Sequence, residues 1–178
     1  MNLGQTMITI GMFVLLVMSV ISANRMLLEN TEANYTTEAM NASATIAQDL
    51  LQEAMSKRFD ANSNDTGTQD TTAFSLPAAL GPSAYERTQV GTLPDTSSTG
   101  NFRSIAAYGD FDDYKGYSRR VTANGISGFI ASTTVYYVTE FDPEVPTGKR
   151  TYYKVIEVSV SHSLYLPTPI TVTGLLSY

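Results

Sequence analysis

The chain has 178 residues, with 11 Lys and Arg, 17 Asp and Glu, one His, no Cys and no Trp, and its formal net charge is −6. The lack of Cys excludes disulfides, thiolate nucleophiles, Cys-ligated zinc and iron–sulfur clusters. The single His162 excludes multi-histidine metal sites. Nucleic acid is not expected as a partner, because the phosphate backbone is bound by clustered Lys and Arg and this chain is acidic.

The first 24 residues carry no charged side chain, and the first charge is that of Arg25. Apolar residues occupy every face of this stretch, so a helix here has no polar stripe to turn toward water. Its length approaches the ~20 residues that a helix needs to cross a bilayer. A secretory signal peptide is the alternative, but residues 1–5 supply no base ahead of the apolar run. The side chains that we expect in a membrane or in the core of an assembly are those of Met7, Ile8, Ile10, Gly11, Phe13, Val14, Leu15, Leu16, Val17, Val20 and Ile21.

The helical pattern continues beyond the apolar stretch, and no Gly or Pro interrupts residues 26–56. Lys57 and Arg58 follow, at a place where the negative end of a helix dipole favours cations. The spacing predicts one helix from about Leu3 to about Phe59, apolar in its first half and amphipathic in its second. The predicted inner face consists of Leu28, Tyr35, Ala39, Ala42, Ile46 and Leu50.

From Asp60 to Asn101 the chain is rich in Asn, Ser, Thr, Gly and Asp, and three prolines interrupt any long regular element. This composition predicts a long connecting region. Structureless loops of such length are uncommon in compact domains, so residues 74–80 or 85–90 are expected to form short elements.

The remainder of the chain shows the period of two that is typical of β-strands. Strands are expected at 117–122, 129–141, 150–164 and 170–176, with turn residues at 142–148. In the third of these, the even positions from Ile156 to Leu164, with His162 among them, share one face.

We therefore expect an α+β fold in which the amphipathic half of the helix covers an antiparallel sheet of about four strands. The expected segments are an apolar helix at 1–24, its amphipathic continuation at 25–59, a variable loop region at 60–116 and the sheet at 117–178.

Two smaller constellations carry candidate chemistry. Asp110, Asp112 and Asp113 place three carboxylates within four residues, which is compatible with a calcium site or with turn formation by Asp; the spacing matches no EF-hand. His162 is compatible with a packed core histidine or with a catalytic one. No Ser/His/Asp set or phosphate-binding glycine loop is recognisable, so we expect neither an enzyme nor a cofactor other than calcium.

Three sites fit the N-glycosylation pattern, at Asn34, Asn41 and Asn64. The pattern is short, so it indicates acceptor sites for glycans without establishing that they are used.

The order of these segments resembles the type IV pilin and pseudopilin superfamily: a polar start with Gly4 and Gln5, an apolar helix that continues into an amphipathic one, a variable loop, and an antiparallel sheet. Two stretches are similar to segments of bacterial pilin-like proteins, namely Tyr108-Gly-Asp-Phe-Asp-Asp-Tyr-Lys-Gly-Tyr117 and Tyr165-Leu-Pro-Thr-Pro-Ile-Thr-Val172.

The resemblance implies a structural subunit that the inner membrane holds by its apolar helix before the pilus assembly machinery stacks it into an extracellular filament. Copies of the chain would then be its main partners, with the helices in the filament core and the sheets outside, in the service of adhesion, motility or surface attachment. The alternative is a membrane-anchored minor pseudopilin, or a single-pass surface or periplasmic binding domain of a secretion machine.

The sequence departs from the superfamily at Gln5, because most bacterial pilins keep a Glu five residues into the mature helix. If Met1 is the first mature residue, Gln5 occupies that position; if Gly4 is the processing glycine, Gln5 is itself the first mature residue. Either way the side chain is neutral, and an amide costs less to bury than an unpaired carboxylate.

Overall fold

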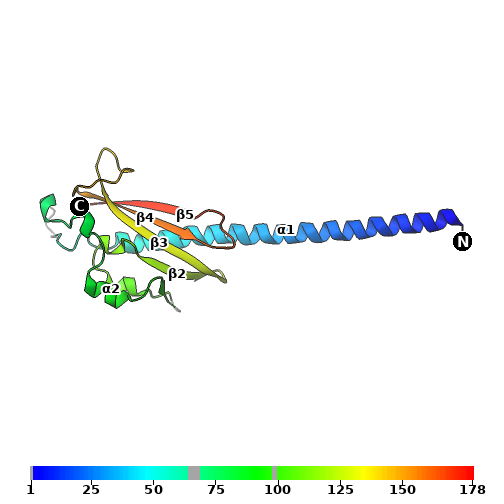
Figure 1. Ribbon diagram of the computed structural model, residues 1–178, viewed down its shortest axis with the longest axis horizontal. Coiled ribbons are helices and arrows are strands. Elements are labelled where there is room, and N and C mark those ends of the chain that lie inside the picture. Colours follow the sequence, from blue (N-terminus) through cyan, green and yellow to red (C-terminus); the bar gives the residue numbers. More distant parts are fainter. Residues whose placement is uncertain (1, 64–68, 98–99) are drawn as a thin grey trace. The chain divides into compact units, whose positions relative to one another are not determined.

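The structure, a computed structural model, describes residues 2–63, 69–97 and 100–178 (Figure 1). The chain forms two compact units, Met1–Glu38 and Ala39–Tyr178. Helix α1 (Leu3–Met55) makes up the first unit and continues into the second, where its last turns pack on a five-stranded sheet. The α+β fold expected from the sequence, a long amino-terminal helix packed on a carboxy-terminal sheet, is confirmed.

Helix α1 ends four residues before the predicted Phe59, and its last turn tightens through a hydrogen bond from the Lys57 amide to the Ala54 carbonyl oxygen (3.1 Å). The side chain of Lys57 does not stay at this helix end. Its Nζ donates to the carbonyl oxygens of Ile105 (2.8 Å) and Tyr108 (2.9 Å), at the carboxyl end of α3 (Arg103–Ala107). The predicted role of this lysine at the dipole of the long helix was therefore wrong.

The strands follow one another in the sheet in chain order, and the last four are antiparallel neighbours. The first is a two-residue strand parallel to the second, so the sheet is mixed, and its edge strand lies in the region predicted as a loop. The bounds are β1 Asp95–Thr96, β2 Ser118–Ala123, β3 Ile126–Val138, β4 Tyr153–Ser161 and β5 Ile170–Ser177.

Two strand bounds differ from the predicted ones for local reasons. Strand β3 begins before Phe129 because Asn124 (φ 52°) and Gly125 (φ 77°) form a tight left-handed turn after β2. Strand β4 stops at Ser161, so Leu164, predicted on the dry face, lies beyond the strand and is 80% exposed.

The region predicted as a variable loop contains short helices at both of the places singled out from the sequence. Helix α2 (Ala84–Val90) starts with a capping box, in which the Ser83 hydroxyl accepts from the Glu86 amide and the Glu86 carboxylate accepts from the Ser83 amide. The three-residue 3₁₀ turns are η1 (Thr71–Ala73), η2 (Pro77–Ala79) and η3 (Asp112–Tyr114).

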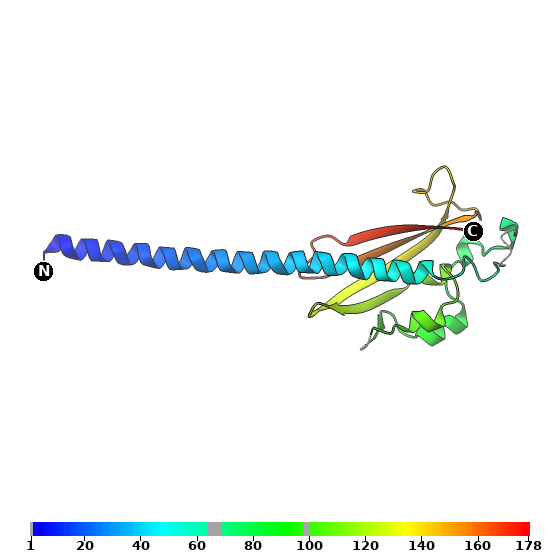
Figure 2. The same ribbon diagram turned by 180° about the vertical axis from the view of Figure 1, so that it is seen from behind.

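Figure 2 shows the molecule with α1 in front of the sheet. Small residues dominate the face of α1 that packs on the sheet. Its buried residues are Ala39, Ala42, Ser43, Ile46, Ala47, Leu50 and Ala54. The predicted inner face is thus correct from Ala39 on, whereas Leu28 and Tyr35 are exposed. Because alanines present only a methyl group, the helix backbone approaches the strands closely.

Gly174 of β5 marks the closest approach. A Cβ atom added there would lie 2.5 Å from Cδ1 of Leu51 and 3.2 Å from Sδ of Met55, both on α1. A larger residue at this position would therefore force the side chains of Leu51 and Met55 to shift.

We predict that Gly174→Ala lowers the free energy of unfolding by about 1–3 kcal/mol, because the added methyl group overpacks this contact. Chemical denaturation followed by tyrosine fluorescence measures the change in a chain that lacks Trp. Leu51→Ala in the Gly174→Ala background should restore part of the loss, since it removes the clashing Cδ1 atom. Additive losses in the double variant would contradict the overpacking explanation.

Candidate functional site

The residues predicted for a membrane or filament core all lie on α1, and none of them is covered by the chain itself. Every described residue from Asn2 to Tyr35 is exposed. Phe13 and Leu16, for example, are 68% and 62% exposed. The uncharged stretch from Leu3 to Asn24 measures about 33 Å at ~1.5 Å per residue, close to the ~30 Å thickness of a bilayer hydrocarbon core.

Among the described residues, α1 is the one helix that is long and apolar enough to cross a membrane by length and composition. Signal sequences and the core helices of soluble proteins meet the same criterion, so the criterion alone does not decide the surroundings of this helix. The exposure of its apolar side chains adds a second fact: none of the described residues buries them.

Several hydroxyl groups along α1 donate to carbonyl oxygens of the helix itself. Thr9 Oγ1, inside the uncharged stretch, donates to the carbonyl oxygens of Thr6 (2.9 Å) or Gln5 (3.1 Å). Farther along, Thr31 and Thr36 donate to the carbonyl oxygens four residues before them. Such back-bonding removes most of the cost of placing a hydroxyl in an apolar medium.

Gly4 and Gly11 have no close neighbour within the chain. A Cβ at either position would meet nothing within 4 Å, so the chain itself imposes no steric need for glycine there. Gln5 lies beside Gly4 in the first turn of α1 and is exposed.

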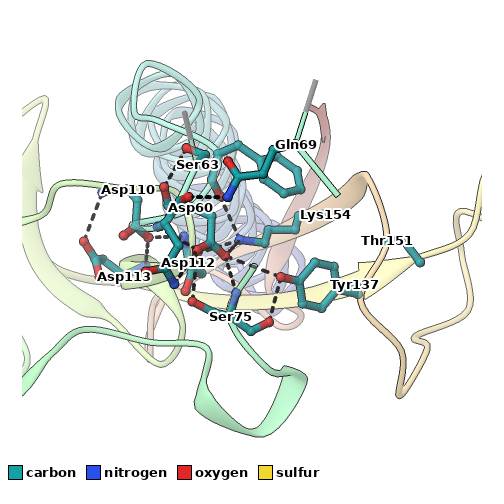
Figure 3. Close-up of polar contacts among 12 residues, drawn as sticks. Asp60, Ser63, Gln69, Ser75, Asp110, Asp112, Asp113, Tyr137, Thr151 and Lys154 are labelled. Atoms are coloured by element: carbon teal, nitrogen blue, oxygen red, sulfur yellow. Dashed lines mark hydrogen bonds and ion pairs between the residues drawn. The ribbon is translucent and has the colours of Figure 1, made fainter. Parts of the chain in front are cut away.

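The second candidate site is a buried ionic cluster at the carboxyl end of α1 (Figure 3). The ammonium group of Lys154, on β4, is fully buried. It donates to the Phe59 carbonyl oxygen (2.8 Å), to Oδ2 of Asp60 (2.9 Å) and to Oδ1 of Asp112 (2.6 Å). The same group lies over the rings of Phe59 and Tyr137. A central strand is thereby joined to the chain that leaves α1 and to the acidic motif.

Asp110 and Asp113 form a turn rather than a metal site. Oδ1 of Asp110 accepts from the amides of Asp112 (3.1 Å) and Asp113 (3.3 Å). Oδ2 of Asp113 accepts from the amides of Gly109 (2.8 Å) and Asp110 (3.1 Å). Asp112 is bound to Lys154 and the other two carboxylates accept from backbone amides, and no group of three possible ligands for a metal ion occurs in the described parts of the chain. The calcium interpretation is not supported by this geometry, and turn formation accounts for the motif.

Burial sets the protonation of this cluster. It raises the pKa of Asp110 to about 8, with the neighbouring Asp112 carboxylate as a further cause. It also raises the pKa of Asp113 to about 6, against the effect of the two amides that this carboxylate accepts from. For Asp60 burial acts in the same direction, but hydrogen bonds from Lys154, Asn62 and Ser75 outweigh it and lower the pKa. The cluster therefore holds its proton on the Asp110 side and its charge on the Asp60 side.

A second polar network ties the tyrosines of the acidic motif to α1. Oε1 of Glu53 accepts from the hydroxyls of Ser104 (2.7 Å) and Tyr114 (2.8 Å), and Oε2 forms an ion pair with Arg119 (2.6 Å). The Tyr117 hydroxyl donates to Asp95 of β1 (3.1 Å). Residues of the motif Tyr108–Tyr117 thus connect helix α1 to the sheet through hydrogen bonds.

His162 serves the backbone at the end of β4. Its Nδ1 accepts from the amides of Leu164 and Tyr165, both at 3.2 Å, and its Nε2 therefore donates to the Ser127 carbonyl oxygen (3.1 Å). The ring packs against Phe129. Both ring nitrogens are thus engaged in structural contacts, as a core histidine requires.

The glycosylation patterns fall on two kinds of position. Asn34 and Asn41 are exposed on α1, and Asn64 lies outside the described residues.

Comparisons with protein-family models, with curated proteins and with solved structures found no match to this chain.

The sequence interpretation missed Glu53, Asp60, Arg119 and Lys154 as site residues. For Lys154 a signal was present: it has the same parity as Ile156 and Val158, so it falls on the dry face of a strand that must bury it. A lysine at such a position requires acidic partners, and the chain offers them in the motif 110–113. Glu53 carried no comparable signal, because an acidic residue near a helix end is usual on an exposed face.

We predict that Lys154→Met lowers the free energy of unfolding by about 3–5 kcal/mol, since it leaves Asp60 and Asp112 buried without their cation. Urea denaturation measures the effect. Adding Asp60→Asn and Asp112→Asn to the variant should recover part of the loss. A Lys154→Met chain as stable as the unsubstituted one would contradict the role assigned to this ion pair.

The raised pKa of Asp110 predicts a defined pH dependence. Because the folded state holds the proton more tightly than the unfolded state, this group's contribution to stability is complete below about pH 4 and is lost as the pH rises toward 8. Asp110→Asn keeps an acceptor oxygen and cannot ionise, so its stability relative to the unsubstituted chain should rise between pH 4 and pH 8. Thermal melts across this range test the prediction, with the exposed Asp142→Asn as the matched control. Parallel curves for the two Asp110 forms would overturn it.

Proposed function

We propose that this chain is a structural subunit of an extracellular helical filament of the type IV pilus kind, with its amino-terminal helices bundled in the core and its sheets on the outside. The observation that carries the proposal is the exposure of an uncharged, apolar stretch on every face of α1, in a helix that continues without a break into a stretch packed on the five-stranded mixed sheet. The resemblance of the segment order to type IV pilins supports the same function.

The physical argument rests on the cost of wetting this helix. Each large apolar side chain left in water costs on the order of 1.5–3 kcal/mol, and more than ten of them lie between Leu3 and Ile21. A bilayer removes this cost before assembly, and a bundle of identical helices removes it afterwards. Transfer from the inner membrane to the filament core thus exchanges one apolar medium for another.

Helix contacts would then decide the stability of the filament, since lipid and protein interiors are equally apolar. Gly11 supports this step: it serves no steric purpose inside one chain, and small residues allow the helices of different copies to approach closely.

The second candidate function is a membrane-anchored minor pseudopilin, or a single-pass surface or periplasmic domain. The single helix that meets the criterion for a membrane span favours it equally, because an anchor needs no more than this. Abundance distinguishes the two functions: sheared surface material contains the chain as a dominant band if it is a major filament subunit, and lacks it if it is a membrane anchor.

We predict that Leu16→Glu abolishes filaments while the domain from Ala39 to Tyr178 still folds, because it buries an unpaired carboxylate in the helix bundle. Electron microscopy of sheared surface material measures assembly, and circular dichroism of the detergent-solubilised chain measures folding. Leu164→Glu, on another exposed leucine that lies outside the helix, is the control and should assemble normally. Abundant filaments of the Leu16→Glu chain would refute the buried-core arrangement.

A further inference from the structure

A pocket of about 350 Å³ lies beside α2, and its charge is opposite to that of the protein as a whole. Its walls are apolar and aromatic, from Pro82, Val90, Leu93, Tyr108 and Tyr117, with Gly91 and Gly116 between them. The two charged side chains that line it are both cations, Arg87 and Lys115.

The cations of this pocket are available for a ligand. Arg87 is exposed and forms no ion pair with any residue that the structure describes, while Lys115 donates one hydrogen bond, to the Pro77 carbonyl oxygen (3.2 Å). Arg87 also borders a neighbouring pocket, and the carboxylates of Glu86, Asp110, Asp112 and Asp113 line only that second pocket. At about 350 Å³ the pocket stands near the lower end of the ~300–1,000 Å³ range of ligand sites, which suits one aromatic side chain with an acidic neighbour.

The loop between β3 and β4 has the complementary character. Phe141 is 94% exposed, the most exposed large apolar side chain among the described residues, and Val145 is also exposed. Glu140, Asp142 and Glu144 lie within three residues of Phe141 in the chain, and their carboxylates have no hydrogen-bond or ion-pair partner in the described ranges.

The loop is also restrained in a way that favours binding. Pro143 and Pro146 fix two of its backbone angles. Its ends are held by hydrogen bonds from the Asp142 amide to the Thr139 carbonyl oxygen (3.3 Å) and from the Thr147 amide to the Tyr137 carbonyl oxygen (2.8 Å). A restrained loop loses less conformational entropy when it docks.

We propose that the β3–β4 loop of one copy docks into the pocket beside α2 of the next copy, with Phe141 in the aromatic pocket and its acidic neighbours facing Arg87 and Lys115. The proposal rests on the proposed filament function and names a contact within that filament. Charge complementarity identifies the occupant: the pocket is cationic on an acidic protein, and the chain itself displays an apolar residue flanked by three carboxylates.

The placement of the two surfaces suits a polymer. Within the unit Ala39–Tyr178, the loop between β3 and β4 and helix α2 lie on opposite flanks in both views (Figures 1 and 2), and α2 contributes Arg87 and Val90 to the pocket. Two different surfaces on opposite flanks are suited to a head-to-tail contact, which repeats from copy to copy and produces a ring or an open helix.

Cysteine cross-linking tests the contact cleanly because the chain has no Cys of its own. Val145→Cys places a thiol on the loop and leaves Phe141 intact, and Leu93→Cys places one on the pocket wall, where the leucine is 41% exposed. When chains with one substitution each are assembled together and oxidised, we expect covalent dimers. A chain with both substitutions should give a ladder of higher multiples, since each copy then offers both ends of the contact.

Leu175→Cys is the matched control for Leu93→Cys, because this leucine is 47% exposed but lies on β5, away from the pocket. Paired with Val145→Cys it should give no cross-link. A charge test adds a second readout: Arg87→Glu with Lys115→Glu should reduce the cross-link at least tenfold, and Glu140→Lys with Glu144→Lys in the partner chain should restore it.

The outcomes separate this inference from the proposed function. Filaments of the unsubstituted chain, seen by electron microscopy before any cysteine is introduced, test the function, and their absence defeats both proposals. Normal filaments without the Val145–Leu93 cross-link overturn the docking contact and leave the filament standing. A cross-link that persists unchanged after charge reversal in the pocket also overturns it. Binding of free aromatic carboxylates such as phenylacetate to the assembled filament, with the pocket still open, would assign the pocket to a small ligand instead.

Discussion

The arrangement of helix and sheet depends above all on the fully buried cation of Lys154. Lys154 brings one positive charge into the interior, where it costs several kcal/mol unless it is paired, and the two carboxylates that pair it come from the chain leaving α1 and from the acidic motif. In the chain, Lys154 is about 95 residues away from the segment that leaves α1 and about 40 residues away from the acidic motif. The register between helix, connecting region and strand is therefore fixed by charge as well as by packing.

Glu53, near the end of α1, likewise joins segments that are far apart in the chain. Its carboxylate accepts hydrogen bonds from two hydroxyl groups and a guanidinium that belong to three other elements. The alanines on the neighbouring turns of the helix allow close packing but make no directional contacts. Packing of small residues is smooth, and a helix held by it alone could slide along the strands. The polar contacts at the carboxyl end remove that freedom, so close packing and charge pairing have separate tasks in this unit.

The periodic pattern of apolar residues in the sequence was sufficient to predict most of the fold. The even positions of β4 and the small residues of α1 from Ala39 on are local patterns, so the antiparallel strands and the inner face of the helix were predictable from the sequence. The failures were non-local. That Asp112 would meet Lys154, or that Glu53 would meet Arg119, depends on register across the whole unit, and no spacing in the sequence encodes it. Leu164 failed for a different reason, because parity holds only as long as the strand does.

The apolar character of α1 in its uncharged stretch, Leu3 to Asn24, has a consequence for what can surround it. Thr9 donates its hydroxyl hydrogen to a carbonyl oxygen of the preceding turn, and most of the exposed surface of this stretch is hydrocarbon. A helix surface of this kind packs well against any neighbour that is apolar and complementary in shape. Lipid acyl chains and apolar helices of other copies both meet this requirement. Which of them surrounds the helix is then decided by shape and by the contacts that the rest of the protein makes.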